Sequence, residues 1–202
     1  IWGLNIVLQL GIALLLTMAL ALFFGMGVPS TASYILLSSL VAPVLVKLGV
    51  PLLGAHLFIY YYTIIANLTP PVGSAAIVAS RIADANFTRT CFTAMRLALV
   101  ALILPFMFVY KPALLAQGSF LDILETTLFA AMGLVAFAAG WEGWLLVRAG
   151  VIERCLLLLA GVLLIPPMPF WLSAVALAIL AFPVLAQWRR SRSHMPEAPV
   201  SA

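Results

Sequence analysis

Two adjacent prolines interrupt a long apolar stretch of this chain, and a helix cannot run through them unbroken. The run is Asn67-Leu68-Thr69-Pro70-Pro71-Val72-Gly73, and the apolar sequence around it is long enough to cross a membrane. In hydrocarbon, a broken helix is tolerated only where it is buried in protein or lines a watery cavity. The carbonyl groups freed by the break, beside Asn and Thr oxygens, predict a cation site near the middle of the membrane.

The composition supports a membrane protein. The chain has 202 residues, of which 65% are hydrophobic and 8% are charged, whereas about a quarter of the residues of a soluble domain are charged. Several apolar runs supply the roughly 20 residues that a membrane helix needs. We therefore predict an all-α, polytopic membrane protein. The net charge of +4 is spread over the ends of these runs, so we expect no nucleic-acid partner.

The apolar runs and the turn residues between them predict the order of the helices. Gly25–Thr31 is predicted to separate the first two segments, the polar loop 84–93 to follow the broken segment, and Pro105 to kink the next span. The tail 189–202 is predicted to be disordered. The predicted segments are 4–24, 31–46, 53–83, 95–109, 123–146, 155–165 and 170–188.

The positive charges predict how the chain is oriented in the membrane. If the first two segments return to their starting side and each later span alternates, eight arginines gather on one side, while Lys47 and Lys111 lie on the other. Basic loops stay in the cytoplasm, so we expect a cytoplasmic C-terminus. Two full spans and one re-entrant hairpin both return to the same side, so the charges leave these two alternatives open.

Two groups of residues are candidates for a binding site. The turn between the first two segments is either a hairpin tip that meets an ion or substrate, or an ordinary surface turn. The interrupted segment is either an unwound helix that binds Na⁺ through oxygen ligands, or a proline kink stabilised by neighbouring helices. The turn candidates are Gly25, Gly27, Pro29, Ser30 and Thr31. The candidates in the interruption are Asn67, Thr69, Pro70, Pro71, Gly73 and Ser74.

A pair of broken helices favours a transporter, because such breaks build the binding sites of many secondary transporters. The sequence contains no nucleotide-binding loop, HExxH motif or supported Ser/His/Asp arrangement, so we do not expect an enzyme. The alternatives are a different ion-coupled carrier that needs no binding protein and a non-transporting scaffold subunit. The residues leave the choice between Na⁺ and H⁺ as the coupling ion open.

Four motifs resemble a known family. The chain has Gly25-Met26-Gly27-Val28-Pro29-Ser30-Thr31-Ala32, Leu-Gly-Val-Pro at 48–51, His56-Leu57-Phe58 and Leu68-Thr69-Pro70-Pro71-Val72-Gly73. Over residues 1–115 it is similar to the large membrane subunit of tripartite ATP-independent periplasmic (TRAP) transporters. Within that family it resembles the fused permeases that work with TAXI-type binding proteins. The chain begins at Ile1 in apolar sequence, so we interpret it as the C-terminal part of a longer permease.

The resemblance implies an architecture and a mechanism. Residues 1–118 would be the C-terminal half of a transport domain that moves as an elevator, with a re-entrant hairpin, a discontinuous helix and a following span. Residues 119–188 would be additional transmembrane helices, and 189–202 a cytoplasmic tail. The expected partners are a periplasmic substrate-binding protein, the remaining N-terminal part of the permease and the lipid of a bacterial inner membrane.

The resemblance also implies the ligands of the site. The coupling ion would be Na⁺, and the substrate would be an organic acid with a carboxylate group. The implied Na⁺ ligands are Gly25, Gly27, Asn67, Thr69, Pro70 and Gly73. The implied substrate-binding residues are Pro29, Ser30, Thr31 and Thr69.

Overall fold

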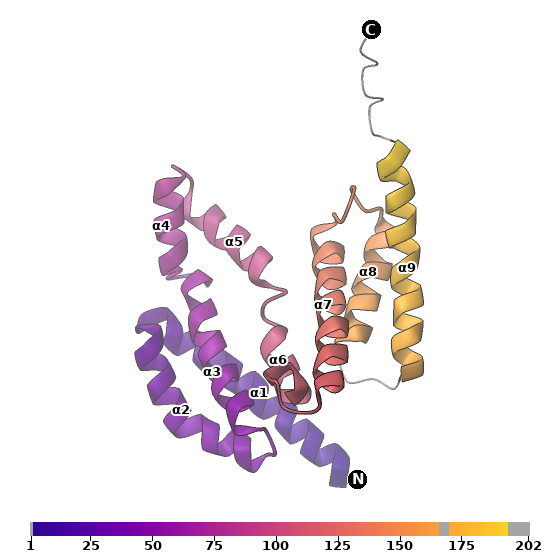
Figure 1. Ribbon diagram of the computed structural model, residues 1–202. Helices are drawn as coiled ribbons and strands as arrows, with labels where there is room; N and C mark the ends of the chain where they lie inside the picture. Colours follow the sequence, from indigo (N-terminus) through magenta and orange to yellow (C-terminus); the bar gives the residue numbers. More distant parts are fainter. Residues whose placement is uncertain (1, 166–169, 194–202) are drawn as a thin grey trace. The chain divides into compact units, whose positions relative to one another are not determined.

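The structure is a computed structural model that describes residues 2–165 and 170–193 (Figure 1). Within these ranges the regular elements are helices, apart from one isolated bridge between Trp144 and Arg148. The chain is therefore an all-α, polytopic membrane protein, as predicted. The candidate membrane spans among the described residues are Leu8–Gly27, Ser30–Lys47, Phe120–Glu142 and Leu172–Arg190. The chain divides into two compact units, Ile1–Gly118 and Ser119–Ala202.

A helical hairpin opens the first unit. Helix α1 (Trp2–Gly27) turns through Val28 and Pro29 into α2 (Ser30–Lys47) (Figure 1). The break is shorter than the predicted turn at Gly25–Thr31, because glycine permits a helix while proline removes a backbone donor. Pro29 itself has extended backbone angles, with φ −50° and ψ 136°.

The next element is the discontinuous helix that the double proline predicts. Helix α3 (Leu52–Ile65) tightens into a short 3₁₀ turn, η1 (Ala66–Leu68), and helix α4 (Ser74–Ile82) continues beyond the interruption (Figure 1). Thr69 is extended, and Gly73 adopts the left-handed conformation with φ +47° before α4 begins. Left-handed backbone carries little steric cost for glycine, so Gly73 lets the chain re-enter a helix directly after the prolines.

Two predictions for the following segment are wrong. Helix α5 (Phe87–Ala98) begins inside the predicted polar loop 84–93, because the Asn86 side chain accepts a hydrogen bond of 3.1 Å from Arg89 N and caps the helix. The predicted span 95–109 is also divided, since α6 (Leu104–Tyr110) is a separate helix. Pro105 lies in the first turn of α6, where a missing N–H costs nothing. A 3₁₀ turn, η2 (Pro112–Leu115), ends the unit.

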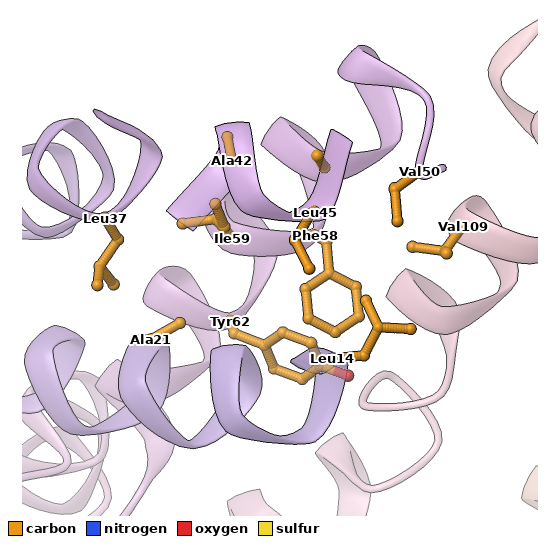
Figure 2. Close-up of a cluster of buried hydrophobic side chains, with 11 residues drawn as sticks. Leu14, Ala21, Leu37, Ala42, Leu45, Val50, Phe58, Ile59, Tyr62 and Val109 are labelled. Atoms are coloured by element: carbon orange, nitrogen blue, oxygen red, sulfur yellow. The ribbon is translucent and has the colours of Figure 1, made fainter. Parts of the chain in front are cut away.

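The core of this unit holds the hairpin against α3. Leu14 of α1, Leu45 of α2 and Phe58 and Tyr62 of α3 are fully buried and lie close together in Figure 2. The Phe58 and Tyr62 rings pack edge to face, with centroids 4.9 Å apart. Tyr62 also donates a hydrogen bond of 2.5 Å to the Leu102 carbonyl. Apolar and aromatic contacts therefore fix the position of the hairpin tip relative to the interruption.

Among its described residues, the second unit contains three helices: α7 (Phe120–Glu142), α8 (Val151–Leu164) and α9 (Phe170–Ser193). Figure 1 shows α8 between α7 and α9, and it packs against both. Helix α7 ends at Glu142 instead of the predicted 146, because Gly143 turns the chain with φ +76°. Helix α9 continues to Ser193, so the start of the predicted disordered tail is helical. The rest of that tail, and the prolines at 166–169, lie outside the described residues.

A polar cluster ties α9 to the start of α8. The Glu153 carboxylate pairs with Arg190 and accepts hydrogen bonds from Gly150 N and from Gln187 Nε2. Glu153 lies outside the candidate spans. Desolvation raises the pKa of its carboxyl, but these hydrogen bonds outweigh that effect and lower the pKa below its usual range. The ionised carboxylate therefore stabilises the fold fully at pH values above the usual pKa of a glutamate side chain. This contribution is lost as the pH falls through the lowered pKa of the folded state.

Gln187→Leu should destabilise the second unit. Gln187 is fully buried, and its Oε1 accepts hydrogen bonds from Leu146 N and Val147 N. Leucine removes the acceptor of these partly buried hydrogen bonds, so the free energy of unfolding should fall by about 1–3 kcal/mol. Denaturant titration of the chain in detergent measures this, with the exposed Gln117→Leu as the matched control. Equal shifts in the two variants would contradict the prediction.

Candidate functional site

The hairpin tip lies directly against the interrupted helix. A Cβ atom at Gly25 would lie 2.6 Å from Ala66 Cβ and 2.8 Å from the Thr63 carbonyl oxygen. These distances are shorter than van der Waals contact, so α1 approaches η1 so closely that only glycine fits. The structure thus brings the two predicted breaks together.

Asn67 joins three elements at this contact. Its Nδ2 donates hydrogen bonds of 2.9 Å to Ser30 Oγ on α2 and 3.0 Å to the Ile64 carbonyl of α3. Its Oδ1 accepts a hydrogen bond of 3.0 Å from Ser74 Oγ, the first residue of α4. A carbonyl oxygen can only accept a hydrogen bond. The group that faces the Ile64 carbonyl must therefore be the NH₂ group of Asn67, which fixes the orientation of the amide. The NH₂ group faces the tip, and the amide oxygen faces α4.

Thr69 and Gly73 have different neighbours. Thr69 Oγ1 donates to the Ile65 carbonyl at 3.2 Å and lies 3.4 Å from Met95 Sδ of α5. A Cβ atom at Gly73 would lie 2.6 Å from Cys91 Sγ, also on α5. The interruption therefore contacts the tip through Asn67 and α5 through Thr69 and Gly73.

The candidate residues differ in how exposed they are. Gly27, Pro29 and Thr31 are exposed, and Ser30 is half-buried. A Cβ atom at Gly27 would meet nothing within 4 Å, so the tip is open on that side. In the interruption, Pro70 is half-buried and Pro71 is exposed.

The sequence analysis missed Ser33. This side chain is 1% exposed, and its Oγ donates to the carbonyls of Phe24 at 3.1 Å and Val28 at 3.4 Å. It therefore adds a second hydrogen bond to the Phe24 carbonyl, which already accepts one of 3.2 Å from Val28 N, and it also contacts the Val28 carbonyl in the turn. A hydroxyl residue one turn after the break is the signal that predicts such a contact.

A groove runs beside Asn67 along the start of α4. Its volume is about 550 Å³. Asn67 and Ser74 are its polar side chains, among apolar residues of α3 and α4. Neutral amide, hydroxyl and carbonyl oxygens are the ligands that hard monovalent cations accept. The N-terminal end of α4 adds partial positive charge, which favours an anion nearby. The arrangement is therefore suited to hold a cation and a carboxylate side by side.

A comparison with protein families identifies the region that contains this site. The family model described as "Tripartite ATP-independent periplasmic transporter, DctM component" matches residues 2–123. The match includes the hairpin, the interrupted helix, α5 and α6, and it extends only a few residues into α7. No curated protein and no solved structure matches the chain.

Proposed function

Because the chain belongs to the DctM family of tripartite ATP-independent periplasmic transporters, we propose that it forms part of a Na⁺-coupled permease for organic acids. A periplasmic binding protein would deliver the carboxylate to the permease. The hairpin and the interrupted helix would form half of a transport domain that moves as an elevator, together with the remaining N-terminal part. The hairpin would open from the periplasmic side of a bacterial inner membrane, with the C-terminus in the cytoplasm.

The observation that carries this proposal is the Asn67 bridge between the tip and α4. Na⁺ would bind where the two breaks meet, through carbonyl groups of Gly25, Gly27, Pro70 and Gly73 together with Asn67 and Thr69. Of these, Asn67 has the strongest support, because its amide contacts both Ser30 of the tip and Ser74 of α4. The Thr69 hydroxyl faces α5, so its contribution requires a rotation of that side chain.

Coupling follows from competition for the Asn67 amide. In the structure, the amide oxygen is engaged by Ser74, and the NH₂ group holds Ser30. A cation at this contact would attract the amide oxygen and the Ser30 hydroxyl oxygen, and would rearrange both bonds. The ion would thereby stabilise one arrangement of the tip over another, which is the condition for a gradient to drive transport. The substrate carboxylate would then meet Pro29, Ser30, Thr31 and Thr69.

Asn67→Ala should raise the Na⁺ concentration needed for half-maximal uptake by about tenfold, which corresponds to the loss of about 1.4 kcal/mol of ion binding. Uptake would be measured with the complete permease in liposomes, together with its binding protein. Asn86→Ala is the matched control, because Asn86 caps α5 and lies outside the site.

Three outcomes decide this proposal. An unchanged Na⁺ requirement in both Asn67→Ala and Thr69→Ala would contradict the assigned ligands. Uptake that follows a proton gradient without Na⁺ would identify H⁺ as the coupling ion. Uptake without the binding protein would identify a carrier that acts alone.

A further inference from the structure

Two arginines with no partner among the described residues lie at the corner where α4 ends and α5 begins. Arg81 is in the last turn of α4 and Arg89 in the first turn of α5, and both are exposed. An open pocket of about 610 Å³ lies at this corner. Its lining residues are Ile77, Ser80, Arg81, Asp84, Ala85 and Phe87.

The lengths of α3 and α4 fit a position of this corner at a membrane surface. Helices α3 and α4 contain 14 and 9 residues, which correspond to about 21 Å and about 14 Å at a rise of ~1.5 Å per residue. Figure 1 shows α4 continuing onward from α3. Their combined length is close to the ~30 Å thickness of the hydrocarbon core. If α3 starts at one boundary of the membrane, α4 ends at the other.

The side chains around the arginines are apolar and exposed. Ile82 is 82% exposed and Phe92 is 64% exposed. Phe92 lies three residues after Arg89, so the two share one side of α5. The opposite side of α5 carries buried Cys91 and Ala98. Cationic heads among exposed apolar side chains are typical of a surface that sits between headgroups and acyl chains.

We propose that this corner binds the headgroup of an anionic phospholipid. The lipid phosphate would lie between Arg81 and Arg89, and its acyl chains would lie along Ile82 and Phe92. The Asp84 carboxylate lines the same pocket and offsets part of the positive charge, so binding is weaker than two free arginines would give. The inference rests on the proposed orientation, which places this corner on the cytoplasmic side, and not on Na⁺ coupling.

Charge complementarity favours a lipid over other occupants. In the proposed orientation the basic side of the protein faces the cytoplasmic leaflet, and an arginine near an anionic surface contributes about fivefold to binding. Arginine also binds phosphate through two parallel hydrogen bonds. An acidic segment of the remaining permease is the competing occupant, and the experiment separates the two.

The test measures lipids retained by the complete permease in native mass spectrometry. Dioleoyl phosphatidylglycerol is the anionic probe, and dioleoyl phosphatidylcholine is the neutral one. Arg81→Gln and Arg89→Gln should each weaken phosphatidylglycerol binding about fivefold, with little change for phosphatidylcholine. Asp84→Asn should strengthen phosphatidylglycerol binding, and Arg89→Lys should retain part of it. Lys47→Gln is the matched control, because Lys47 is exposed and lies on the opposite side of the membrane in the proposed orientation.

Several outcomes would overturn the inference. One is an unchanged preference for phosphatidylglycerol in the double variant Arg81→Gln/Arg89→Gln with an unchanged melting temperature. Another is weaker association with the N-terminal part of the permease while lipid binding stays constant, which would assign the surface to a protein partner. Full displacement of the lipid by inorganic phosphate would also contradict it. Binding is measured without Na⁺ and without uptake, so a failure of the proposed coupling leaves this result intact.

Discussion

Gly25→Ala should reduce uptake by the complete permease at least tenfold. The added methyl group would lie 2.6 Å from Ala66 Cβ and 2.8 Å from the Thr63 carbonyl oxygen. The Thr63 carbonyl belongs to the backbone of α3, so α1 has to move away from the interrupted helix. Overpacking of this kind costs about 1–3 kcal/mol. The shift separates Ser30 from Asn67, whose hydrogen bond is 2.9 Å long, and thereby opens the proposed ion site.

The matched control for this variant is Gly11→Ala in the same helix. A Cβ atom at Gly11 meets nothing within 4 Å, so uptake should stay close to that of the unmodified permease. Ala66→Gly, combined with Gly25→Ala, removes the Cβ–Cβ contact but keeps the contact with Thr63, and should restore uptake in part. Equal uptake by Gly25→Ala and Gly11→Ala would show that the close approach of the tip is not needed for transport.

Gly161→Ala should destabilise the second unit. A Cβ atom there would lie 2.8 Å from both Phe137 Cβ and Phe137 N, and 2.9 Å from the Gly133 carbonyl oxygen. Two of these atoms belong to the backbone of α7, so the packing of α7 on α8 cannot adjust by side-chain rotation alone. Because backbone atoms must move, we expect a cost in the upper part of the range of about 1–3 kcal/mol for overpacking, which leaves a net loss of about 1–2 kcal/mol after the gain of about 1 kcal/mol that alanine brings within a helix.

Thermal unfolding in detergent, followed by circular dichroism, measures this effect. Gly150→Ala is the control in the same unit, because a Cβ atom at Gly150 meets nothing within 4 Å. Its position as the N-cap of α8 predicts a change of no more than about 1 kcal/mol. An equally large effect in both variants would mean that helix propensity, and not the contact between α7 and α8, determines the loss.

Two interruptions, the one at Pro29 and the one at Pro70 and Pro71, could be predicted from the sequence because their causes are local. Pro29 and the pair Pro70 and Pro71 remove backbone donors wherever they stand, and the helices end beside them. The start of α5 was not predicted, because its residues are as polar as those of a typical loop. The polar and apolar residues of this segment lie on separate faces only once it forms a helix.

The candidate site could be predicted in its parts but not in its contacts. Asn67, Ser30 and Ser74 stand among the residues singled out from the two breaks. No local rule indicates that the Asn67 amide would contact Ser30, which is 37 residues away in the chain. Ser33 was missed because its role depends on carbonyl groups at the end of a different helix.

The sequence by itself determined the membrane character of this protein and the breaks at Pro29 and at Pro70 and Pro71, since apolar length and proline chemistry act along the chain. Only the tertiary structure decided which surfaces meet. Gly25 and Gly27 are alike in sequence, yet a Cβ atom at Gly25 would collide with Ala66, whereas one at Gly27 would meet nothing within 4 Å. The physical reason is that close packing depends on the positions of atoms from distant segments, which the packing of the buried core between α1, α2 and α3 establishes.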